Sequence, residues 1–325
     1  MDRLEELKEL IKERKKIVLT ELDERILEAV KLILKDDLID IIMLGDKEEL
    51  KDSYKELAKC LWINPKDSVY LDEFTESLYE LRKNKGLTKE ESRNLLINDY
   101  MYFACMLVYT NKADGIVSGI CHSSANTIRP ALQIIKGKDK IVSSFMLMDT
   151  NNEKLGDKGL FIFSDCGLNQ NPTSEELSII CKQSIESYNM LIKRVPKVAF
   201  LSYSTNGSSK HTDVDKVRMA KDLAVNSLKD VIIDGEIQLD AAIDKDIQEM
   251  KYPNSKIKGD ANILIFPNLD AGNIGYKLVE RFANAKAYGP LLQGLNKAVN
   301  DLSRGSSVMD VYGVIIITAL EAQNY

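Results

Sequence analysis

The sequence predicts an α/β protein with two domains, each packing helices against a largely parallel sheet. Short apolar runs alternate with segments of helical periodicity along the chain, which is typical of this class. The 325 residues exceed what a single hydrophobic core usually holds, so two domains are expected. Hydrophobic residues make up 44% and charged residues 29%, a balance that predicts a soluble globular protein.

The first half of the chain opens with an expected helix, because Leu4, Leu7, Leu10 and Ile11 share one face. Uninterrupted apolar runs predict buried strands, over residues 17–19, 39–44, 68–71 and 114–119. Helical periodicity predicts helices over 21–34, from 47, over 73–82, 88–97 and 99–109, and in the segment after 119.

The second half begins with a predicted hairpin, whose strands at 141–149 and 159–164 are joined by a polar segment containing Gly156. The domain boundary is expected just before it. Thr173 or Ser174, followed by Glu176, is the expected N-cap of the next helix. Further strands are predicted over 197–203, 230–233 and 261–266, and helices over 174–193, 213–227 and 272–282.

The final helix is expected over residues 307–322 and carries apolar residues around its whole circumference. We therefore expect it to be buried, most economically by returning to the first domain. Ser307 and Asp310 have the spacing of a capping box at its start.

Composition excludes several classes of function. The net charge of −6, without a basic block, does not predict nucleic-acid binding. The longest apolar run, near residues 314–320, is too short to span a membrane, and the N-terminus lacks an apolar signal region. Only two histidines are present, and no cysteine pair has zinc-ligand spacing, so no metal site is expected. Five scattered cysteines favour free thiols in a reducing cytoplasm.

Residues 113–130 form the first candidate for chemistry, since a strand, a small-residue loop and a helix start follow one another. This order presents backbone N–H groups to an anion, and Ser124, Thr127 and Arg129 add donors suited to phosphate. The spacing alone favours an ordinary capped helix start near Pro130.

Two later stretches are weaker candidates when they are taken alone. Residues 202–211 form a hydroxyl-rich turn after a buried strand, which is more typical of an ordinary loop than of a nucleotide site. Glu236 and Asp240 lack a third metal ligand, so they are interpreted as lying at a solvated strand end. A glycine-rich helix entry follows at 270–277.

Residues 289–319 form the stretch around which the chain is organised. Within eleven residues it gathers Asn300, Asp301, Ser303, Arg304 and Asp310, on a glycine-bearing loop that leads into the last helix. Loops held by a rigid scaffold are common places for catalytic residues. Asp310 has two open interpretations, as a helix cap and as a catalytic carboxylate.

These stretches together resemble the phosphate acetyltransferase family. The run at 293–305, Gln-Gly-Leu-Asn-Lys-x-Val-Asn-Asp-Leu-Ser-Arg-Gly, is similar to its C-terminal signature. Ala-Asp-Gly-x-Val-Ser-Gly-x-x-His-Ser at 113–123 and Ser-x-Ser-Thr-x-Gly-Ser-x-Lys-His at 202–211 are similar to family segments. Asp-Gly-Glu-x-Gln-x-Asp-Ala-Ala at 234–242 is a further match, and the likeness covers roughly residues 78–320.

The resemblance implies that the chain interconverts acetyl-CoA plus phosphate with acetyl phosphate plus CoA, a reaction of acetate metabolism. It implies two three-layer α/β domains with a cleft between them, similar to isocitrate and isopropylmalate dehydrogenases. By this likeness the first domain is 1–139 plus 292–325 and the second is 140–291. A cytoplasmic homodimer is expected, with coenzyme A as substrate and no tightly bound cofactor.

The resemblance also assigns roles to residues. Ser303 and Arg304 are placed at the CoA thiol and the reacting carbonyl, and Asp310 is the proposed base. The residues expected to bind substrate are Arg82, Ser124, Arg129 and Asn300. Family members often have a cysteine after Ser-Arg-Gly, whereas this chain has Ser306, so no catalytic cysteine is expected there.

An ordinary aspartate is a weak base toward a thiol. With pKa values near about 3.9 and 8.5, the proton transfer costs roughly 6 kcal/mol. We favour an arrangement in which Arg304 and Ser303 lower the thiol pKa. The expected mechanism is direct attack of the thiolate on acetyl phosphate in a ternary complex, with Arg304 and N–H groups at the oxyanion and Arg129 at the leaving phosphate.

Three alternatives remain open at this point. A phosphate butyryltransferase, or another short-chain acyltransferase, shares the expected fold. A non-catalytic regulatory module is a second alternative, although Ser303, Arg304 and Asp310 are all present. A metal-dependent decarboxylating dehydrogenase is the third, by analogy of fold alone.

Overall fold

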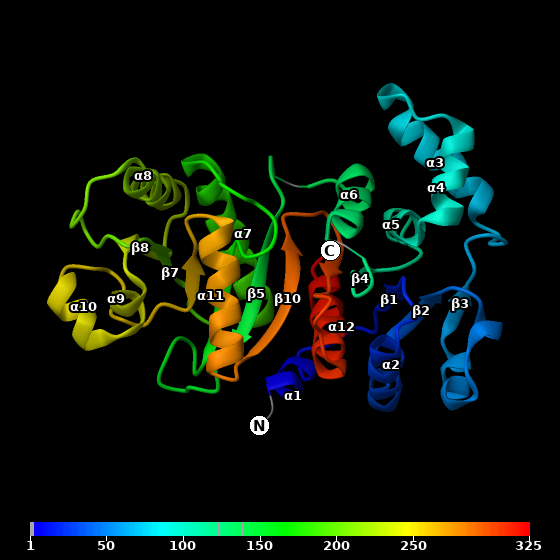
Figure 1. The fold of residues 1–325 in the computed structure, drawn as a ribbon, viewed down its shortest axis with the longest axis horizontal. Helices are drawn as coiled ribbons and strands as arrows, with labels where there is room; N and C mark the ends of the chain where they lie inside the picture. Colours follow the sequence, from blue (N-terminus) through cyan, green and yellow to red (C-terminus); the bar gives the residue numbers. More distant parts are fainter. Residues whose placement is uncertain (1–2, 123, 138) are drawn as a thin grey trace. The chain divides into compact units, whose positions relative to one another are not determined.

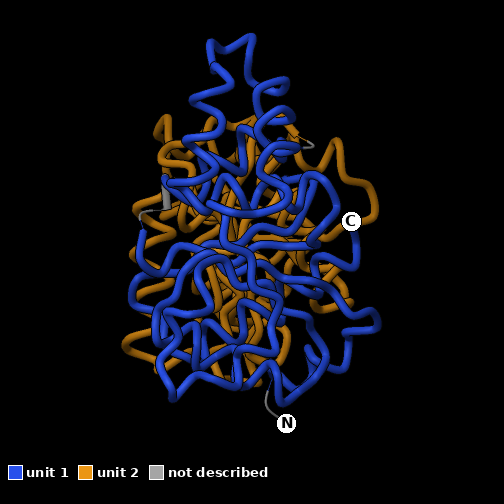
Figure 2. Tube along the Cα trace, turned by 90° about the vertical axis from the view of Figure 1, so that its right-hand side faces the viewer, with its two compact units in different colours: residues 1–138, 295–325 blue, residues 139–294 orange. Residues whose placement is uncertain are grey.

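The computed structural model describes residues 3–122, 124–137 and 139–325, and the chain divides into two compact units. Unit 1 contains residues 1–138 and 295–325, and unit 2 contains residues 139–294. Figure 2 colours unit 1 blue and unit 2 orange. Both units combine a sheet with packed helices, which confirms the predicted α/β class.

The sheet of unit 1 is parallel throughout, with the strand order β3-β2-β1-β4-β11. Its strands are β1 (Lys16–Leu19), β2 (Asp40–Leu44), β3 (Leu61–Ile63), β4 (Gly115–Ser118) and β11 (Ala298–Asp301). Strand β4 lies inside this order and is buried along its whole length, because β1 and β11 pair with its two edges and helices α5 and α12 contact it.

Helices of unit 1 form two groups, of which α12, α5 and α6 contact strands of the sheet (Figure 1). The first group is α1 (Arg3–Lys8), α2 (Glu24–Asp36) and α12 (Val308–Ala322). The second group is α3 (Leu71–Arg82), α4 (Lys89–Asn98), α5 (Tyr100–Tyr109) and α6 (Ser124–Ile134). Short 3₁₀ turns occur at Lys47–Glu49, Asp52–Lys59 and Lys83–Lys85. Helix α12 is buried from Val311 to Ala322 and contacts β1, β4 and β11, as its apolar circumference predicts.

The sheet of unit 2 is mixed, with the strand order β10-β5-β6-β9-β7-β8. Strands β5 and β6 form the predicted hairpin, and β10 pairs antiparallel with β5, whereas the remaining pairs are parallel. The strands are β5 (Ser143–Asp149), β6 (Leu160–Ser164), β7 (Lys197–Leu201), β8 (Ile232–Ile237), β9 (Ile263–Ile265) and β10 (Lys286–Gln293).

Helices of unit 2 also cover its sheet (Figure 1). They are α7 (Ser174–Leu191), α8 (Thr212–Ser227), α9 (Leu239–Ile243), α10 (Lys245–Lys251) and α11 (Leu269–Phe282). Helices α7 and α8 pack together, whereas Tyr276 of α11 joins a core with Met146, Phe161 and Phe163. Thr173 caps α7 and forms a capping box with Glu176, as predicted.

Several predicted elements were wrong or missing. Residues 68–71 are not a strand: Val69 is 89% exposed and Leu71 already belongs to α3. Helix α2 begins at Glu24 rather than at residue 21, because the Asp23 side chain accepts the N–H of Arg25 as its N-cap. The unpredicted elements are β3, β10, β11, α9 and α10.

Candidate active site

Three strands of unit 1 end side by side at the carboxyl edge of its sheet. Leu19 of β1 pairs with Val117 of β4, and Asp301 of β11 pairs with Ser118. The loops that follow residues 19, 118 and 301 therefore start within one or two strand spacings of each other. Ligands of parallel α/β sheets bind at such carboxyl ends, so this edge is the candidate active site.

The loop after β4 lies tightly against β11. The backbone N–H of Leu302 donates to the Ser118 carbonyl at 2.7 Å. Gly119 has φ +109°, and a Cβ atom there would lie 1.9 Å from Oδ1 of Asp301. Only glycine fits this position, so the close approach of the two loops depends on it.

A pocket of about 360 Å³ opens beside these strand ends within unit 1. Thr20 and Ser118, whose hydroxyls lie 2.5 Å apart, form one part of its lining. The loop before α5 and the start of α6 supply the rest: Asn98, Asp99, Tyr100, Met101, His122, Asn126 and Thr127.

Thr127 of α6 is the most informative residue of this pocket. It is only 1% exposed, and its hydroxyl has no hydrogen-bond partner among the described residues. Leaving a buried hydroxyl unpaired costs about 1–3 kcal/mol, so a ligand that accepts from it would remove a penalty. Near a helix N-terminus, an anion is the ligand that also benefits from the helix dipole. The sequence placed Thr127 among the hydroxyl donors without singling it out.

Both arginines that are predicted to bind substrate influence the pKa of Tyr102 in α5. Burial raises the pKa of Tyr102, and the positive charges of Arg129 and Arg82 oppose that rise. Burial also raises the pKa of Asp99. The N–H of Met101, which donates to this carboxylate, and the charges of His122 and Arg129 oppose the rise. The charges of Arg82 and Arg129 thus act on the same phenol of α5, and two positive charges favour an anionic ligand.

The third strand end carries Ser303 and Arg304. The backbone N–H of Ser306 donates to the Ser303 carbonyl at 2.9 Å, so the chain makes a tight turn here. Gly305 N–H lies 3.3 Å from the Ser303 hydroxyl, and the Arg304 side chain is exposed. The turn therefore presents a hydroxyl and a guanidinium at the same edge of the sheet as the pocket.

Asp310 closes the start of α12 as the capping box predicted. Its Oδ2 accepts from both the N–H and the hydroxyl of Ser307 at 2.8 Å, and its own N–H donates to that hydroxyl at 3.3 Å. Asp310 is half-buried, so a carboxylate held by the cap still reaches solvent. Its role as a base stays a prediction.

Asn300 and Ser124 are the other two residues that were predicted to bind substrate. Asn300 is fully buried and donates to Thr318 at 2.8 Å and to Glu321 at 2.6 Å, inside the core beneath α12. Its predicted contact with substrate stays a prediction. Ser124 begins α6, but its side chain lies outside the described part of the structure.

The segment after β1 contributes residues that the sequence did not reveal. Glu21 accepts three backbone N–H groups from residues 119–121, and Arg25 donates to two carbonyls of residues 304–306. Asp23 pairs with Arg25 at 2.8 Å, and this hydrogen bond holds the pKa of the Asp23 carboxyl below its usual value. These residues were missed because the sequence predicted that a helix begins at residue 21.

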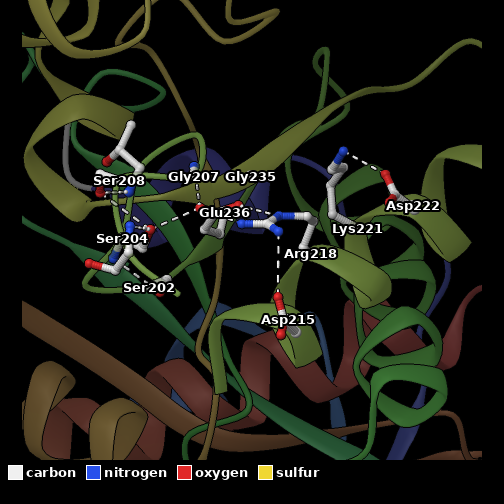
Figure 3. A network of polar contacts seen from close by, with 12 residues as sticks. Ser202, Ser204, Gly207, Ser208, Asp215, Arg218, Lys221, Asp222, Gly235 and Glu236 are labelled. Carbon is white, nitrogen blue, oxygen red and sulfur yellow. Dashed lines mark hydrogen bonds and ion pairs between the residues drawn. The ribbon is translucent and has the colours of Figure 1, made fainter. Parts of the chain in front are cut away.

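Unit 2 contains a second polar network, around Glu236 at the end of β8 (Figure 3). Its carboxylate accepts from the Ser204 hydroxyl at 2.9 Å, from Gly207 N–H at 2.7 Å and from Arg218 Nε at 3.2 Å. Glu236 is 1% exposed, so the predicted solvated strand end was wrong. Burial would raise its pKa, but the bonds from Arg218, Gly207 and Ser204 outweigh burial and hold the pKa below its usual value.

The described residues contain no group of three or more His, Cys, Asp and Glu side chains arranged to hold a metal ion. Within the same part of the chain, no helix has the length and apolar character needed to cross a bilayer.

Comparison with known proteins identifies the family of this chain. A family model described as phosphate acetyl/butaryl transferase matches residues 1–319. A phosphate acetyltransferase of Thermoanaerobacterium thermosaccharolyticum is 47% identical, over 95% of this chain and 96% of that protein. The solved phosphotransacetylase of Streptococcus pyogenes is 41% identical with a TM-score of 0.91, over 99% of this chain and 98% of that one. The EutD phosphotransacetylase of Staphylococcus aureus is 43% identical with a TM-score of 0.88, over 99% and 98%. The chain belongs to the phosphate acetyl/butaryl transferase family.

Proposed function

We propose that this chain is a phosphate acetyltransferase, which transfers an acetyl group reversibly between CoA and phosphate. The observation that carries the proposal is the identity of 47% with a phosphate acetyltransferase over 95% of the chain. The anion-favouring pocket beside the turn of Ser303 and Arg304 supports it independently, because the reaction needs a phosphate next to a thiol.

In the direction of acetyl-CoA synthesis, the CoA thiolate attacks the carbonyl carbon of acetyl phosphate. A C–S bond forms, the bond between the carbonyl carbon and the phosphate oxygen breaks, and phosphate leaves with that electron pair. The thiol proton passes to Asp310. Arg304 and neighbouring N–H groups stabilise the oxyanion of the intermediate.

Phosphate binding is assigned to the pocket at the start of α6. Arg129 holds the leaving phosphate, and the buried Thr127 hydroxyl donates to it. Arg82 binds CoA, while Ser124 and Asn300 remain proposed substrate-binding residues. The support is the charge of both arginines near Tyr102 and the unpaired state of Thr127 among the described residues.

The proton transfer to Asp310 needs a thiol whose pKa is lowered. The exposed Arg304 guanidinium and the Ser303 hydroxyl share one turn, and a positive charge beside a thiolate stabilises it. Lowering the thiol pKa also avoids the opposing effect that Arg304 would have on an aspartate.

We further propose a cytoplasmic homodimer that serves acetate metabolism, uses coenzyme A as a substrate and has no tightly bound cofactor. Residues 1–139 with 292–325 and residues 140–291 are proposed as its two folding domains. The five cysteines are unbonded, and four of them are buried, which supports a reducing location.

The test is phosphate-dependent cleavage of acetyl-CoA, followed as thiol release, for the wild type and for Arg304→Ala. We expect wild-type turnover with acetyl-CoA, slower turnover with butyryl-CoA, and a loss of at least 100-fold in kcat/KM for the variant. Arg281→Ala, an exposed arginine of unit 2, is the matched control and should keep wild-type rates.

Each arm of the test has a contrary outcome. Faster turnover of butyryl-CoA would assign the chain to the longer-chain acyltransferases of the family. No turnover of either thioester would favour a regulatory module. Parallel lines in double-reciprocal plots, together with a trapped acetyl-enzyme, would replace direct transfer by a covalent mechanism.

A further inference from the structure

The segment between β1 and α2 runs beside both candidate substrate loops of unit 1. Glu21 is 6% exposed, and its carboxylate accepts three successive backbone N–H groups. Oε2 accepts from Gly119 at 3.1 Å and from Ile120 at 2.9 Å, while Oε1 accepts from Cys121 at 3.0 Å. One buried carboxylate thus fixes the chain immediately before α6.

Arg25 makes the corresponding contacts with the other loop. Its Nη1 donates to the carbonyl of Arg304 at 2.8 Å and to that of Ser306 at 3.1 Å. Asp23 orients the guanidinium, because its two oxygens accept from Nε at 2.8 Å and from Nη2 at 3.1 Å. The planar fork is therefore held on one side by a carboxylate and used on the other to grip the turn.

Glu21 is poorly suited to touch the substrate itself. A carboxylate repels the phosphates of both substrates, and three N–H groups already occupy its oxygens. Arg25 likewise directs Nη1 to backbone carbonyls, which a ligand would have to displace. Both side chains act on the site through the backbone that they hold.

We propose that Glu21 and Arg25 are positioning residues that set the two substrate loops relative to each other. Glu21 fixes the loop that leads into the phosphate pocket, and Arg25 fixes the turn that carries Ser303 and Arg304. Both residues lie within five positions on one short segment, so a single rigid anchor serves both loops. The expected changes in kinetic constants rest on the proposed function, whereas the expected changes in backbone order do not.

The two residues should affect different kinetic constants. Arg25→Lys keeps the charge but loses the fork, so Arg304 is misplaced in the transition state and kcat falls about 10- to 100-fold with little change in the KM for phosphate. Glu21→Gln replaces one acceptor oxygen by an NH₂ group, which disrupts the bonds to residues 119–121 and raises the KM for phosphate about tenfold.

The control is Arg14→Lys, two residues before the start of β1. Arg14 also bridges two carboxylates, with Asp40 Oδ1 at 2.9 Å and Asp37 Oδ1 at 2.7 Å, and it donates to the Asp37 carbonyl. It lies at the opposite edge of the same sheet, so its replacement should leave both constants unchanged. A general loss of stability would lower the active fraction, and with it the apparent kcat, but would leave KM unchanged, so the rates of every variant are expressed per folded molecule.

A second measurement does not depend on activity. Amide hydrogen exchange of Ile120 and Cys121 should be at least tenfold faster in Glu21→Gln than in the wild type, while the strand β4 stays protected. Wild-type kinetics in both variants, per folded molecule, would overturn the proposal. Unchanged exchange at residues 120 and 121 would overturn the role of Glu21, whether or not the wild type is active. A wild type that is inactive with acetyl-CoA would count only against the proposed function.

Discussion

Asn300 Nδ2 donates to Glu321 Oε2 across 2.6 Å, and neither side chain is more than 3% exposed. Asn300 comes from β11 and Glu321 from the last turn of α12, so the bond joins the strand to the helix inside the core of unit 1. Burial raises the pKa of Glu321 to about 8, although the bond from Asn300 opposes this rise.

The first prediction concerns the pH dependence of stability. As pH rises above the ordinary value of 4.5, the unfolded chain releases the Glu321 proton while the folded chain keeps it up to about pH 8. The folded state binds more protons in this window, so Glu321 lowers the free energy of unfolding as pH rises, by up to about 1.4 kcal/mol per pH unit. Glu321→Gln cannot titrate and should gain stability relative to the wild type between pH 5 and pH 8.

Urea unfolding at pH 5 and pH 8 measures this difference. Glu249→Gln, on an exposed face of α10, is the control and should follow the wild type at both pH values. A stability difference between Glu321→Gln and the wild type that stays constant with pH would show that Glu321 is ionised in the folded protein.

The second prediction separates the two roles of Asp310. Asp310→Asn keeps a carbonyl oxygen that can accept the Ser307 N–H, but it cannot take a proton from a thiol. We expect kcat to fall at least 100-fold. Ser307→Ala keeps the carboxylate and breaks the capping box, which should lower the free energy of unfolding by about 1 kcal/mol and leave kcat within a few-fold of the wild type.

Steady-state rates and thermal unfolding of both variants decide between base and cap. If Asp310→Asn keeps its activity, Asp310 is only a cap, and another base must be sought near the pocket, where Asp99 has a raised pKa.

The third prediction concerns the unpaired hydroxyl of Thr127. Thr127→Val has the same shape without the hydroxyl, so the free energy of unfolding should rise by about 1 kcal/mol. The KM for phosphate should rise about tenfold, because the donor to the anion is lost. Stability and substrate affinity therefore change in opposite directions.

Thr110→Val provides the contrast, since the Thr110 hydroxyl donates to the Met106 carbonyl at 2.8 Å. This variant should lose stability and keep its KM. Thr127→Val with a lower stability and an unchanged KM would mean that the hydroxyl serves the fold and not the ligand.

The fourth prediction concerns the Glu236 network of unit 2. Arg218→Ala leaves the buried Glu236 carboxylate without its cation and should lower the free energy of unfolding by about 2 kcal/mol. The value is below the roughly 3–5 kcal/mol of a fully buried pair. The reason is that the Arg218 side chain is 40% exposed. The double variant with Glu236→Gln should recover part of the loss, because no uncompensated charge remains.

Chemical denaturation of these variants checks the network, with Lys245→Ala as the control. Lys245 forms an exposed pair with Glu249 at 4.0 Å, and its loss should change stability by less than about 0.5 kcal/mol. If Arg218→Ala and Lys245→Ala changed the free energy of unfolding equally, the pair of Arg218 and Glu236 would contribute no more than an ordinary surface ion pair.

Regular apolar patterns made most of the fold predictable. The hairpin of β5 and β6, the capped helix α7 and the buried helix α12 follow directly from such patterns. Strand β11 was missed because two of its four residues, Asn300 and Asp301, are polar yet buried. Strand β10 was missed because Gly289 and Pro290 interrupt it, where its register with β5 shifts between Tyr288 and Leu291.

The candidate site was predictable only in part. The resemblance to a family indicated Ser303, Arg304, Asp310 and Arg129, because these residues lie in contiguous motifs, and their roles stay predictions. Glu21 and Arg25 belong to no such motif, because their partners are backbone atoms of residues about 100 and 280 positions away, and any sequence supplies N–H groups and carbonyls. Position in the sheet, and not residue type, makes them relevant.

The order of the strands also has a consequence for how the protein is made. Unit 2 is one continuous segment, residues 139–294, whereas β11 and α12 complete unit 1 only after that segment. On the ribosome, the nascent chain therefore holds β1, β2, β3 and β4 without their last strand and covering helix while all of unit 2 is being synthesised. The turn of Ser303 and Arg304 and then helix α12 are synthesised last, so unit 1 stays incomplete and exposed to chaperones and proteases until translation has passed the final helix.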